Sequence, residues 1–102
     1  MIIYNVTVSV EDSIKDKWLQ WMLNEHIPDV LGCGFFLKAQ INQVMSEYDS
    51  SSTFAIAYTS PTLEDFKKYQ SDYAPKFKEQ QMLKFGDKTT AFRTLLNVIR
   101  EF

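Results

Sequence analysis

The chain opens with a strict alternation of apolar and polar side chains. Along residues 2–10, one phase of the alternation holds Ile2, Tyr4, Val6, Val8 and Val10. Alternation with a period of two is typical of a β-strand that buries one face. Residues 2–10 are therefore predicted to form a strand that turns these five side chains toward the core.

After residue 11 the period changes to that of a helix. Asp12 or Ser13 is a suitable cap for the first turn. At 100° per residue, one apolar stripe then contains Ile14, Trp18, Trp21 and Met22. Pro28 cannot donate a backbone hydrogen bond, so we expect this helix to end at residues 25–27 and a short new turn to cover residues 28–31. Gly32 and Gly34 follow and end that turn.

Two further strands are predicted, with a polar loop between them. They cover residues 35–45 and residues 53–59, and both alternate like the first. Their in-phase apolar positions are Leu37, Ala39 and Ile41, then Phe54, Ile56 and Tyr58. The serine-rich residues 46–52 suit a hairpin loop.

The last part of the chain predicts a second helix and a final strand. Ser60 and Pro61 suit the N-cap and the first position of the helix. Its inward stripe contains Leu63, Phe66, Gln70 and Tyr73. Pro75 breaks this helix, and one or two further turns extend over residues 75–85. Gly86 and Asp87 stop them, and residues 89–99 form the last strand, with Phe92, Leu96 and Val98 in one phase.

The predicted order is β-α-β-β-α-β, which is the ferredoxin-like arrangement of a single α+β domain over residues 1–102. Two helices cover only one face of a four-stranded antiparallel sheet. The face toward the helices is predicted to carry Val6, Val8, Ile41, Phe54, Ile56 and Phe92. The open face would carry Asn5, Thr7, Lys38, Gln40, Ala55, Ala57, Arg93 and Leu95. Because that face is uncovered and partly apolar, we expect a homodimer that associates through the sheet.

Composition and charge narrow the function classes. The 102 residues carry a net charge of −2, with acidic and basic side chains interleaved, whereas a nucleic-acid-binding protein usually shows a basic patch. No apolar run approaches the roughly 20 residues that span a bilayer, and the N-terminus shows no secretory leader. The single cysteine, Cys33, cannot form an internal disulfide. We therefore expect a cytoplasmic protein that binds neither nucleic acid nor membranes.

Several segments together resemble a known family. They are residues 1–8 (MIIYNVTV), 18–22 (WLQWM), 26–31 (HIPDVL), 85–88 (FGDK) and 91–94 (AFRT). The combination is similar to a small uncharacterised bacterial family, filed as a domain of unknown function. That family looks like a member of the dimeric α/β-barrel group, whose ferredoxin-like protomers pair sheet to sheet. The group includes small monooxygenases, isomerases, haem-degrading enzymes and stress proteins, and several members have a similar histidine in a His-x-Pro context.

His26 is the only histidine, and it has the only side chain whose ordinary pKa lies near neutrality. It follows Met22 by four residues and so lies at the edge of the apolar stripe. Two interpretations are open. His26 either acts as a general base or ligand-binding group in a cleft between helix and sheet, or stabilises the C-terminus of the helix as a cation.

Glu25 lies within the apolar stripe by helical angle, where an unpaired carboxylate is costly. Either the helix has already ended there, or Glu25 pairs with Arg93, Lys38 or a tyrosine. Against two tryptophans its pKa would be raised, and it would serve as an acid. Glu25, His26 and Asp29 lie close together in the sequence, but metal-binding spacing such as H-E-x-x-H is absent, so no metal site is expected.

Two functional interpretations follow. In the first, the protein is a non-catalytic or ligand-binding dimer. In the second, it is a small enzyme without a cofactor, a monooxygenase or an isomerase, that acts on an apolar aromatic substrate in the helix–sheet cleft. His26 would be the acid/base of that enzyme. Trp18, Trp21 and Tyr58 would form the walls, with Arg93 as a further ligand-binding candidate, although two tryptophans at helical spacing are more often part of a core.

Overall fold

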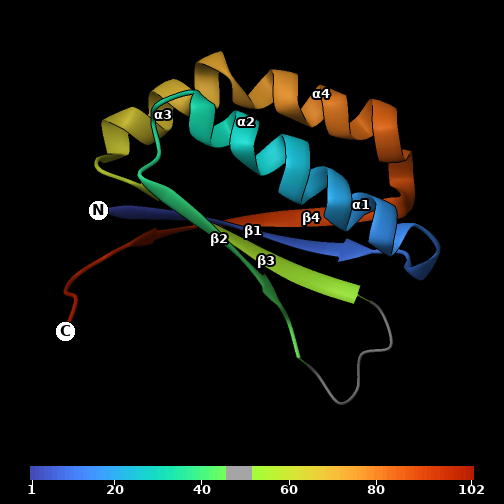
Figure 1. Cartoon of the computed structure of the whole chain (residues 1–102). Helices are drawn as coiled ribbons and strands as arrows, with labels where there is room; N and C mark the ends of the chain where they lie inside the picture. The colour runs from blue at the N-terminus through green and yellow to red at the C-terminus, as the bar shows by residue number, and fades with distance from the viewer. Residues whose placement is uncertain (46–51) are drawn as a thin grey trace.

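The computed structural model describes residues 1–45 and 52–102, and its elements follow the predicted order (Figure 1). The strands are β1 (Ile2–Val10), β2 (Lys38–Gln43), β3 (Ser52–Ser60) and β4 (Thr89–Asn97). They form one antiparallel sheet in the spatial order β2-β3-β1-β4. The helices of the described part lie on one face of this sheet (Figure 1). The predicted ferredoxin-like fold is therefore confirmed.

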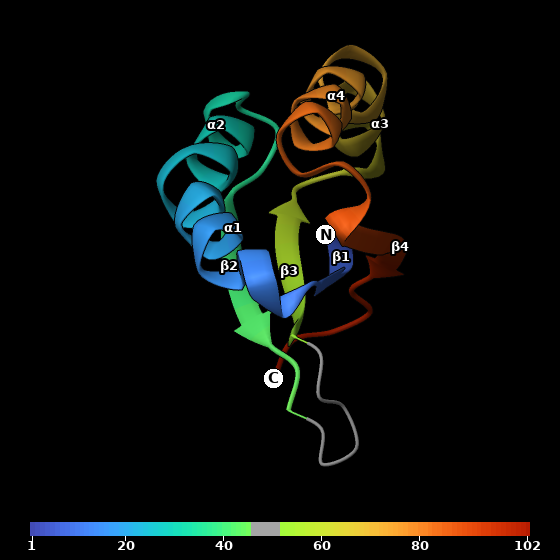
Figure 2. The same ribbon diagram turned by 90° about the vertical axis from the view of Figure 1, so that its right-hand side faces the viewer.

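The helical layer consists of two columns that lie side by side (Figure 2). One column contains α1 (Lys15–Trp21), a π-helical turn (Met22–His26) and α2 (Ile27–Gly32). The other contains α3 (Leu63–Asp72) and α4 (Ala74–Phe85). The core lies between these columns and the sheet and is rich in aromatic rings, among them Tyr4, Trp18, Phe36, Phe54, Phe66, Tyr69 and Phe77.

The prediction that Pro28 ends the first helix is wrong. The helix widens into the π-helical turn, in which the N–H of Ile27 donates to the carbonyl of Met22, and it then continues as α2. A proline has no N–H and crowds the carbonyl four residues before it, and a wider turn accommodates both effects. Because the helix continues, His26 does not lie at a helix terminus. Glu25 is exposed, whereas His26 is half-buried.

Several predicted boundaries are also shifted. Asp12 and Ser13 lie in a 3-10 turn before α1 and form no side-chain cap to it. Strand β2 begins at Lys38 instead of residue 35, and Leu37 is 62% exposed. Within the predicted loop, Ser52 already belongs to β3, and residues 46–51 lie outside the described residues.

The second helical column differs from the prediction at its start and on its buried side. Thr62, not Ser60, caps α3, because its hydroxyl accepts a hydrogen bond from the N–H of Asp65. The buried side chains of α3 are Phe66 and Tyr69, whereas the predicted stripe members Leu63, Gln70 and Tyr73 are exposed. Helix α4 spans 12 residues instead of one or two turns.

The side-chain phase predicted for β4 is wrong. In the pairing of β1 with β4, Val6 lies opposite Arg93, so Arg93 and Leu95 are on the side of the sheet that faces the helices. Phe92 and Leu96 lie on the open face instead. Apolar residues occupy both phases of this edge strand, so alternation alone does not define its inward side. The register with β1 decides it.

No helix among residues 1–45 and 52–102 is long and apolar enough to cross a membrane.

Candidate functional site

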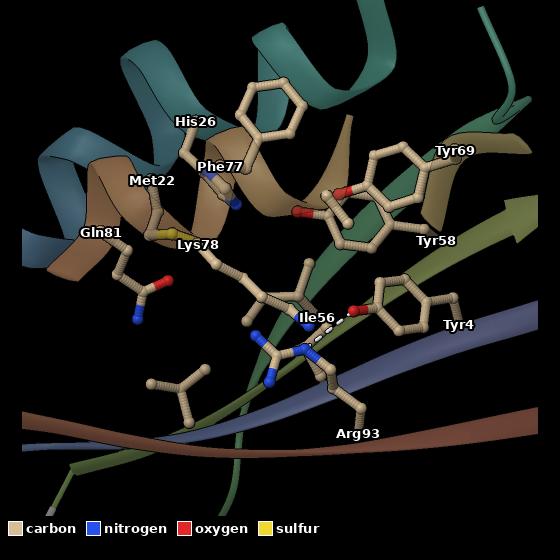
Figure 3. Close-up of a pocket in the computed structure, with 13 residues that line it drawn as sticks. Tyr4, Met22, His26, Ile56, Tyr58, Tyr69, Phe77, Lys78, Gln81 and Arg93 are labelled. Atoms are coloured by element: carbon tan, nitrogen blue, oxygen red, sulfur yellow. Dashed lines mark hydrogen bonds between the residues drawn. The ribbon is translucent and has the colours of Figure 1, made fainter. Parts of the chain in front are cut away.

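A pocket lies between the helices and the helix-facing side of the sheet (Figure 3). Its lining contains Tyr4, Val6, Val8, Met22, His26, Ile56, Tyr58, Tyr69, Ala74, Phe77, Lys78, Gln81 and Arg93. We call it the His26 pocket. Its innermost cavity has a volume of about 30 Å³, which holds about two water molecules. The cavity is therefore sized for one functional group of a ligand, and the rest of a larger ligand must extend outward.

His26 reaches the pocket from the π-helical turn and is held by aromatic rings. Its imidazole stacks on Trp21 with ring centroids 4.8 Å apart, and Phe77 of α4 meets it edge to face at 5.6 Å. Burial lowers the pKa of His26 to about 4; Asp29 opposes this shift, and the Arg93 guanidinium adds to it. Its Nδ1 atom is buried and has no hydrogen-bond partner among the described residues. At neutral pH the ring is thus an uncharged imidazole.

Three tyrosines enter the pocket from the opposite side, and their hydroxyl groups point inward (Figure 3). They are Tyr4 of β1, Tyr58 of β3 and Tyr69 of α3. Burial raises the pKa of all three, so their hydroxyl groups stay protonated at neutral pH. Tyr58 is 2% exposed, and its hydroxyl has no hydrogen-bond partner among the described residues. A protonated hydroxyl of this kind is a ready donor for a ligand oxygen.

Arg93 reaches the pocket from β4, and its Nε donates a 2.9 Å hydrogen bond to the hydroxyl of Tyr4 (Figure 3). This bond ties the guanidinium to β1 across the mouth of the pocket. The terminal nitrogens of Arg93 form no hydrogen bond to another described side chain, and no aspartate or glutamate is among the described residues that line the pocket.

The other predicted site residues lie elsewhere. Trp18 is fully buried, packs on Phe54 at 5.1 Å and does not line the His26 pocket. Trp21 is buried behind the imidazole of His26 and supports it without lining the pocket. Glu25 is exposed on the outer side of the helix, in a shallow groove with Lys84. The structure therefore gathers His26, Tyr58 and Arg93 but keeps Trp18, Trp21 and Glu25 out of the cavity.

Sequence reasoning missed Tyr4, Tyr69, Lys78 and Gln81 as pocket residues. Tyr4 carried a usable signal, because it lies in the buried phase of the first strand yet has a polar end. Tyr69 follows Phe66 by three residues, which is the helical spacing of neighbours on one face. Lys78 and Gln81 gave no signal, because a polar residue on a helix is usually solvated.

Metal-binding and thiol chemistry receive little support from the described side chains. Among residues 1–45 and 52–102, no three His, Cys, Asp or Glu side chains gather as a metal-binding group. Cys33 is partly buried, and burial raises the pKa of its thiol although the Lys76 ammonium opposes the shift. A thiol with a raised pKa is a weak nucleophile.

The order and pairing of the strands place the chain in the group of proteins with a ferredoxin-like fold. Within that group, the chain belongs to the family described as a domain of unknown function, DUF4286, whose model matches residues 1–99. The comparison with curated proteins found no match. The resemblance noted in the sequence is therefore confirmed at the level of the family.

Solved structures agree on the fold. A candidate antibiotic biosynthesis monooxygenase from Deinococcus radiodurans is 13% identical over 100% of this chain and 96% of its own, with a TM-score of 0.74. A dimeric ferredoxin-like protein from an uncultured marine organism is 12% identical over 99% and 97%, with a TM-score of 0.71. An ethyl tert-butyl ether degradation (EthD) family protein from Bacillus halodurans is 11% identical over 92% and 97%, with a TM-score of 0.68. At these identities the likeness carries the fold alone.

Proposed function

We propose that this chain is a homodimeric protein that binds a small molecule in the His26 pocket. The observation that carries the proposal is the Tyr58 hydroxyl, which is buried, faces the pocket and has no partner among the described residues. An unsatisfied buried hydroxyl costs about 1–3 kcal/mol. A ligand oxygen that accepts from it would remove that cost, so the pocket is prepared for a polar group.

Replacing Tyr58 by phenylalanine tests this proposal, because the change removes the hydroxyl and keeps the ring. We expect Tyr58→Phe to leave the free energy of unfolding unchanged or to raise it by up to about 3 kcal/mol, and to weaken ligand binding. Urea denaturation measures the first effect. Titration with small aromatic keto acids, followed on the ring proton signals of His26 by NMR, measures the second. A clear loss of stability would show that the hydroxyl has a structural partner and would count against a binding role.

The open face of the sheet supports the homodimer. The register places Ile3, Ala57, Phe92 and Leu96 on this face, and Phe92 is 64% exposed. The C-terminal tail runs beside the same face (Figure 1), where Val98 lines a hollow with Ile3 and Ala57. From strand rise and spacing, such a face covers roughly 500 Å² per protomer. Two protomers would then bury about 1,000 Å², which is enough for a specific interface.

Placing a charge on the open face should weaken the dimer. We expect Ala57→Glu or Phe92→Glu to shift sedimentation at micromolar concentration from dimer toward monomer, because a buried unpaired carboxylate is costly. The protomer should stay folded. Leu83→Glu on the outer side of α4, where Leu83 is 81% exposed, is the matched control and should leave sedimentation unchanged. If the unmodified protein sediments as a monomer, the homodimer is wrong.

A second candidate function, proton transfer without a cofactor, is favoured by the neutral imidazole of His26 beside protonated tyrosines. The fold shared with a candidate monooxygenase is compatible with such a role. In the simplest step, a ring nitrogen of His26 takes a proton from a carbon next to a ligand carbonyl. The C–H electron pair forms a C=C bond, and the carbonyl π pair moves to oxygen, where the Tyr58 hydroxyl donates a hydrogen bond. Transfer of that proton to the oxygen completes a keto–enol isomerisation, whereas its return to the same carbon regenerates the ligand. The signature of this chemistry is deuterium exchange at that carbon that depends on His26.

A further inference from the structure

Three hollows of the molecule meet at Arg93. One is the His26 pocket. The second, of about 260 Å³, lies between α3 and the outer end of β4 and is lined by Leu63, Phe66, Lys67 and Leu95 among others. The third, of about 230 Å³, lies between α4 and β4 and includes Lys78 and Met82. Arg93 lines all three, and Tyr4 lines the first two. We call the three hollows together the β4 groove.

The β4 groove is basic although the chain is acidic overall. Its lining includes Lys67, Lys78 and Arg93, and no aspartate or glutamate is among the described residues that line it. The whole chain has 13 acidic and 11 basic side chains. A groove whose charged side chains are all basic therefore differs from the rest of the chain. Like charges in one groove repel each other and raise the local potential. An anionic ligand would relieve this repulsion.

Arg93 has the geometry of a carboxylate receptor. Its Nε is engaged by the Tyr4 hydroxyl at 2.9 Å, which orients the guanidinium plane and leaves the terminal nitrogens as the remaining donors. Planar guanidinium groups match the two oxygens of a carboxylate. The neighbouring groups add donors, because the buried hydroxyls of Tyr4, Tyr58 and Tyr69 stay protonated at neutral pH. The pocket thus offers several donors to the oxygen atoms of a ligand.

The groove also has apolar walls that would take an uncharged body. The larger hollow beside α3 places Leu63, Phe66 and Leu95 around Arg93, and Leu63 and Leu95 are 41% and 46% exposed. The inner cavity of about 30 Å³ is too small for a ring. A ligand with a ring in the hollow beside α3, its acidic group at Arg93 and one further polar group in the inner cavity would use two of the three hollows and the arginine that joins them.

We propose that the β4 groove binds small aromatic carboxylates, with the carboxylate on Arg93 and the ring against Leu63, Phe66 and Leu95. This inference rests on the proposed small-molecule site and defines its ligand class. It extends the sequence prediction of an apolar aromatic ligand by an anionic group. Lys67 and Lys78 strengthen the electrostatic attraction for the carboxylate but do not form hydrogen bonds with it.

The test uses phenylpyruvate as the acid and its methyl ester as the neutral counterpart. We expect the acid to bind at least about 10-fold more tightly than the ester, because only the acid offers Arg93 a charged hydrogen-bond acceptor. Arg93→Gln should weaken binding of the acid by about 10- to 100-fold and leave the ester unchanged. Arg93→Lys should recover part of the loss. Lys84→Gln on the outer side of α4, which does not line the β4 groove, is the matched control and should bind the acid normally.

A salt titration keeps the test decisive if Arg93→Gln fails to fold. Raising the ionic strength from about 20 to about 300 mM should weaken binding of the acid to the unmodified protein and leave the ester unaffected. Equal binding of acid and ester, or a binding of the acid that is independent of both Arg93 and salt, overturns the anion proposal while the small-molecule site stands. If neither compound shifts the His26 ring signals at up to about 10 mM, the small-molecule site and the anion proposal are both wrong.

Discussion

Trp18→Ala should lower the free energy of unfolding by about 3–5 kcal/mol, which is the cost of replacing a buried tryptophan by alanine. Trp18 is fully buried and packs against Phe54. It joins the first helix to the sheet, so its truncation would leave a cavity in the core. Because small domains are stable by only about 5–15 kcal/mol, the variant should lose about a fifth of its stability or more. Urea denaturation and thermal melting measure the loss.

Two further variants make this measurement specific. Trp18→Phe keeps an aromatic ring against Phe54 and should lose clearly less stability than Trp18→Ala. Leu83→Ala removes a side chain that is 81% exposed and should change stability by no more than about 0.5 kcal/mol. A Trp18→Ala protein that melts within a degree or two of the unmodified one would contradict the structural role. It would indicate that the indole lines a cavity and would revive Trp18 as a ligand-binding residue.

The pKa of His26 should be about 4 in the folded protein, against about 6.5 in the unfolded chain. Below pH 6.5 the unfolded chain then binds a proton that the folded protein does not. The free energy of unfolding should therefore fall as the pH drops from about 6.5, and the loss from His26 should be complete below about pH 4. A difference of this size corresponds to about 3 kcal/mol. Above pH 6.5 His26 should not change the free energy of unfolding as the pH varies, because its ring is neutral in both states.

NMR titration of the single histidine measures this pKa directly. The groups that face its ring are Asp29 on its own helix, Arg93 of β4, Lys78 of α4 and the tyrosines of the pocket. His26→Asn is the control for stability, because its pH dependence between 4 and 6.5 should lack the His26 contribution. A pKa above 6.5 would contradict the buried neutral imidazole and would restore a role as a cation on the helix.

The same titration bears on catalysis. If His26 is a general base, it accelerates exchange of the methylene protons of phenylpyruvate for deuterium by roughly 10²–10⁴-fold. The neutral ring is the active form, so the accelerated rate should be flat from about pH 5 to 8 and should fall as the pH approaches 4. His26→Asn should abolish it. Phenylpyruvate that binds without accelerated exchange would leave the binding site intact and remove the enzymatic interpretation.

The order and type of the elements were predictable because they follow from short-range properties of the chain. The alternation of Val6, Val8 and Val10 defines a strand wherever that strand pairs, and the spacing of Trp18 and Trp21 defines a helical face. The strand–helix order then permits few arrangements, since two helices can cover only one face of four strands. His26 was recognisable as a candidate for the same reason, because it lies at the edge of an apolar stripe.

The side of the sheet on which Arg93 lies was decided by the tertiary structure. Phe92, Leu95 and Leu96 make both phases of β4 apolar, so no local pattern selects the inward side. Pairing with β1, in which Val6 lies opposite Arg93, selects it, and a shift by one residue would have turned Arg93 to the open face. The charge at the centre of the candidate site thus depends on a register between residues that are far apart in the chain.

The position of His26 was settled in the same way. The residues around Pro28 are compatible with a broken helix or with a π-helical turn, and local propensity does not separate the two. Packing does, because the turn that keeps Met22 buried also turns His26 onto Trp21 and Phe77 while Glu25 remains exposed. The sequence by itself determined which elements form and which face of most of them is buried. Only the tertiary structure brought His26, Tyr58 and Arg93 into one pocket, because they come from three separate elements, the π-helical turn, β3 and β4.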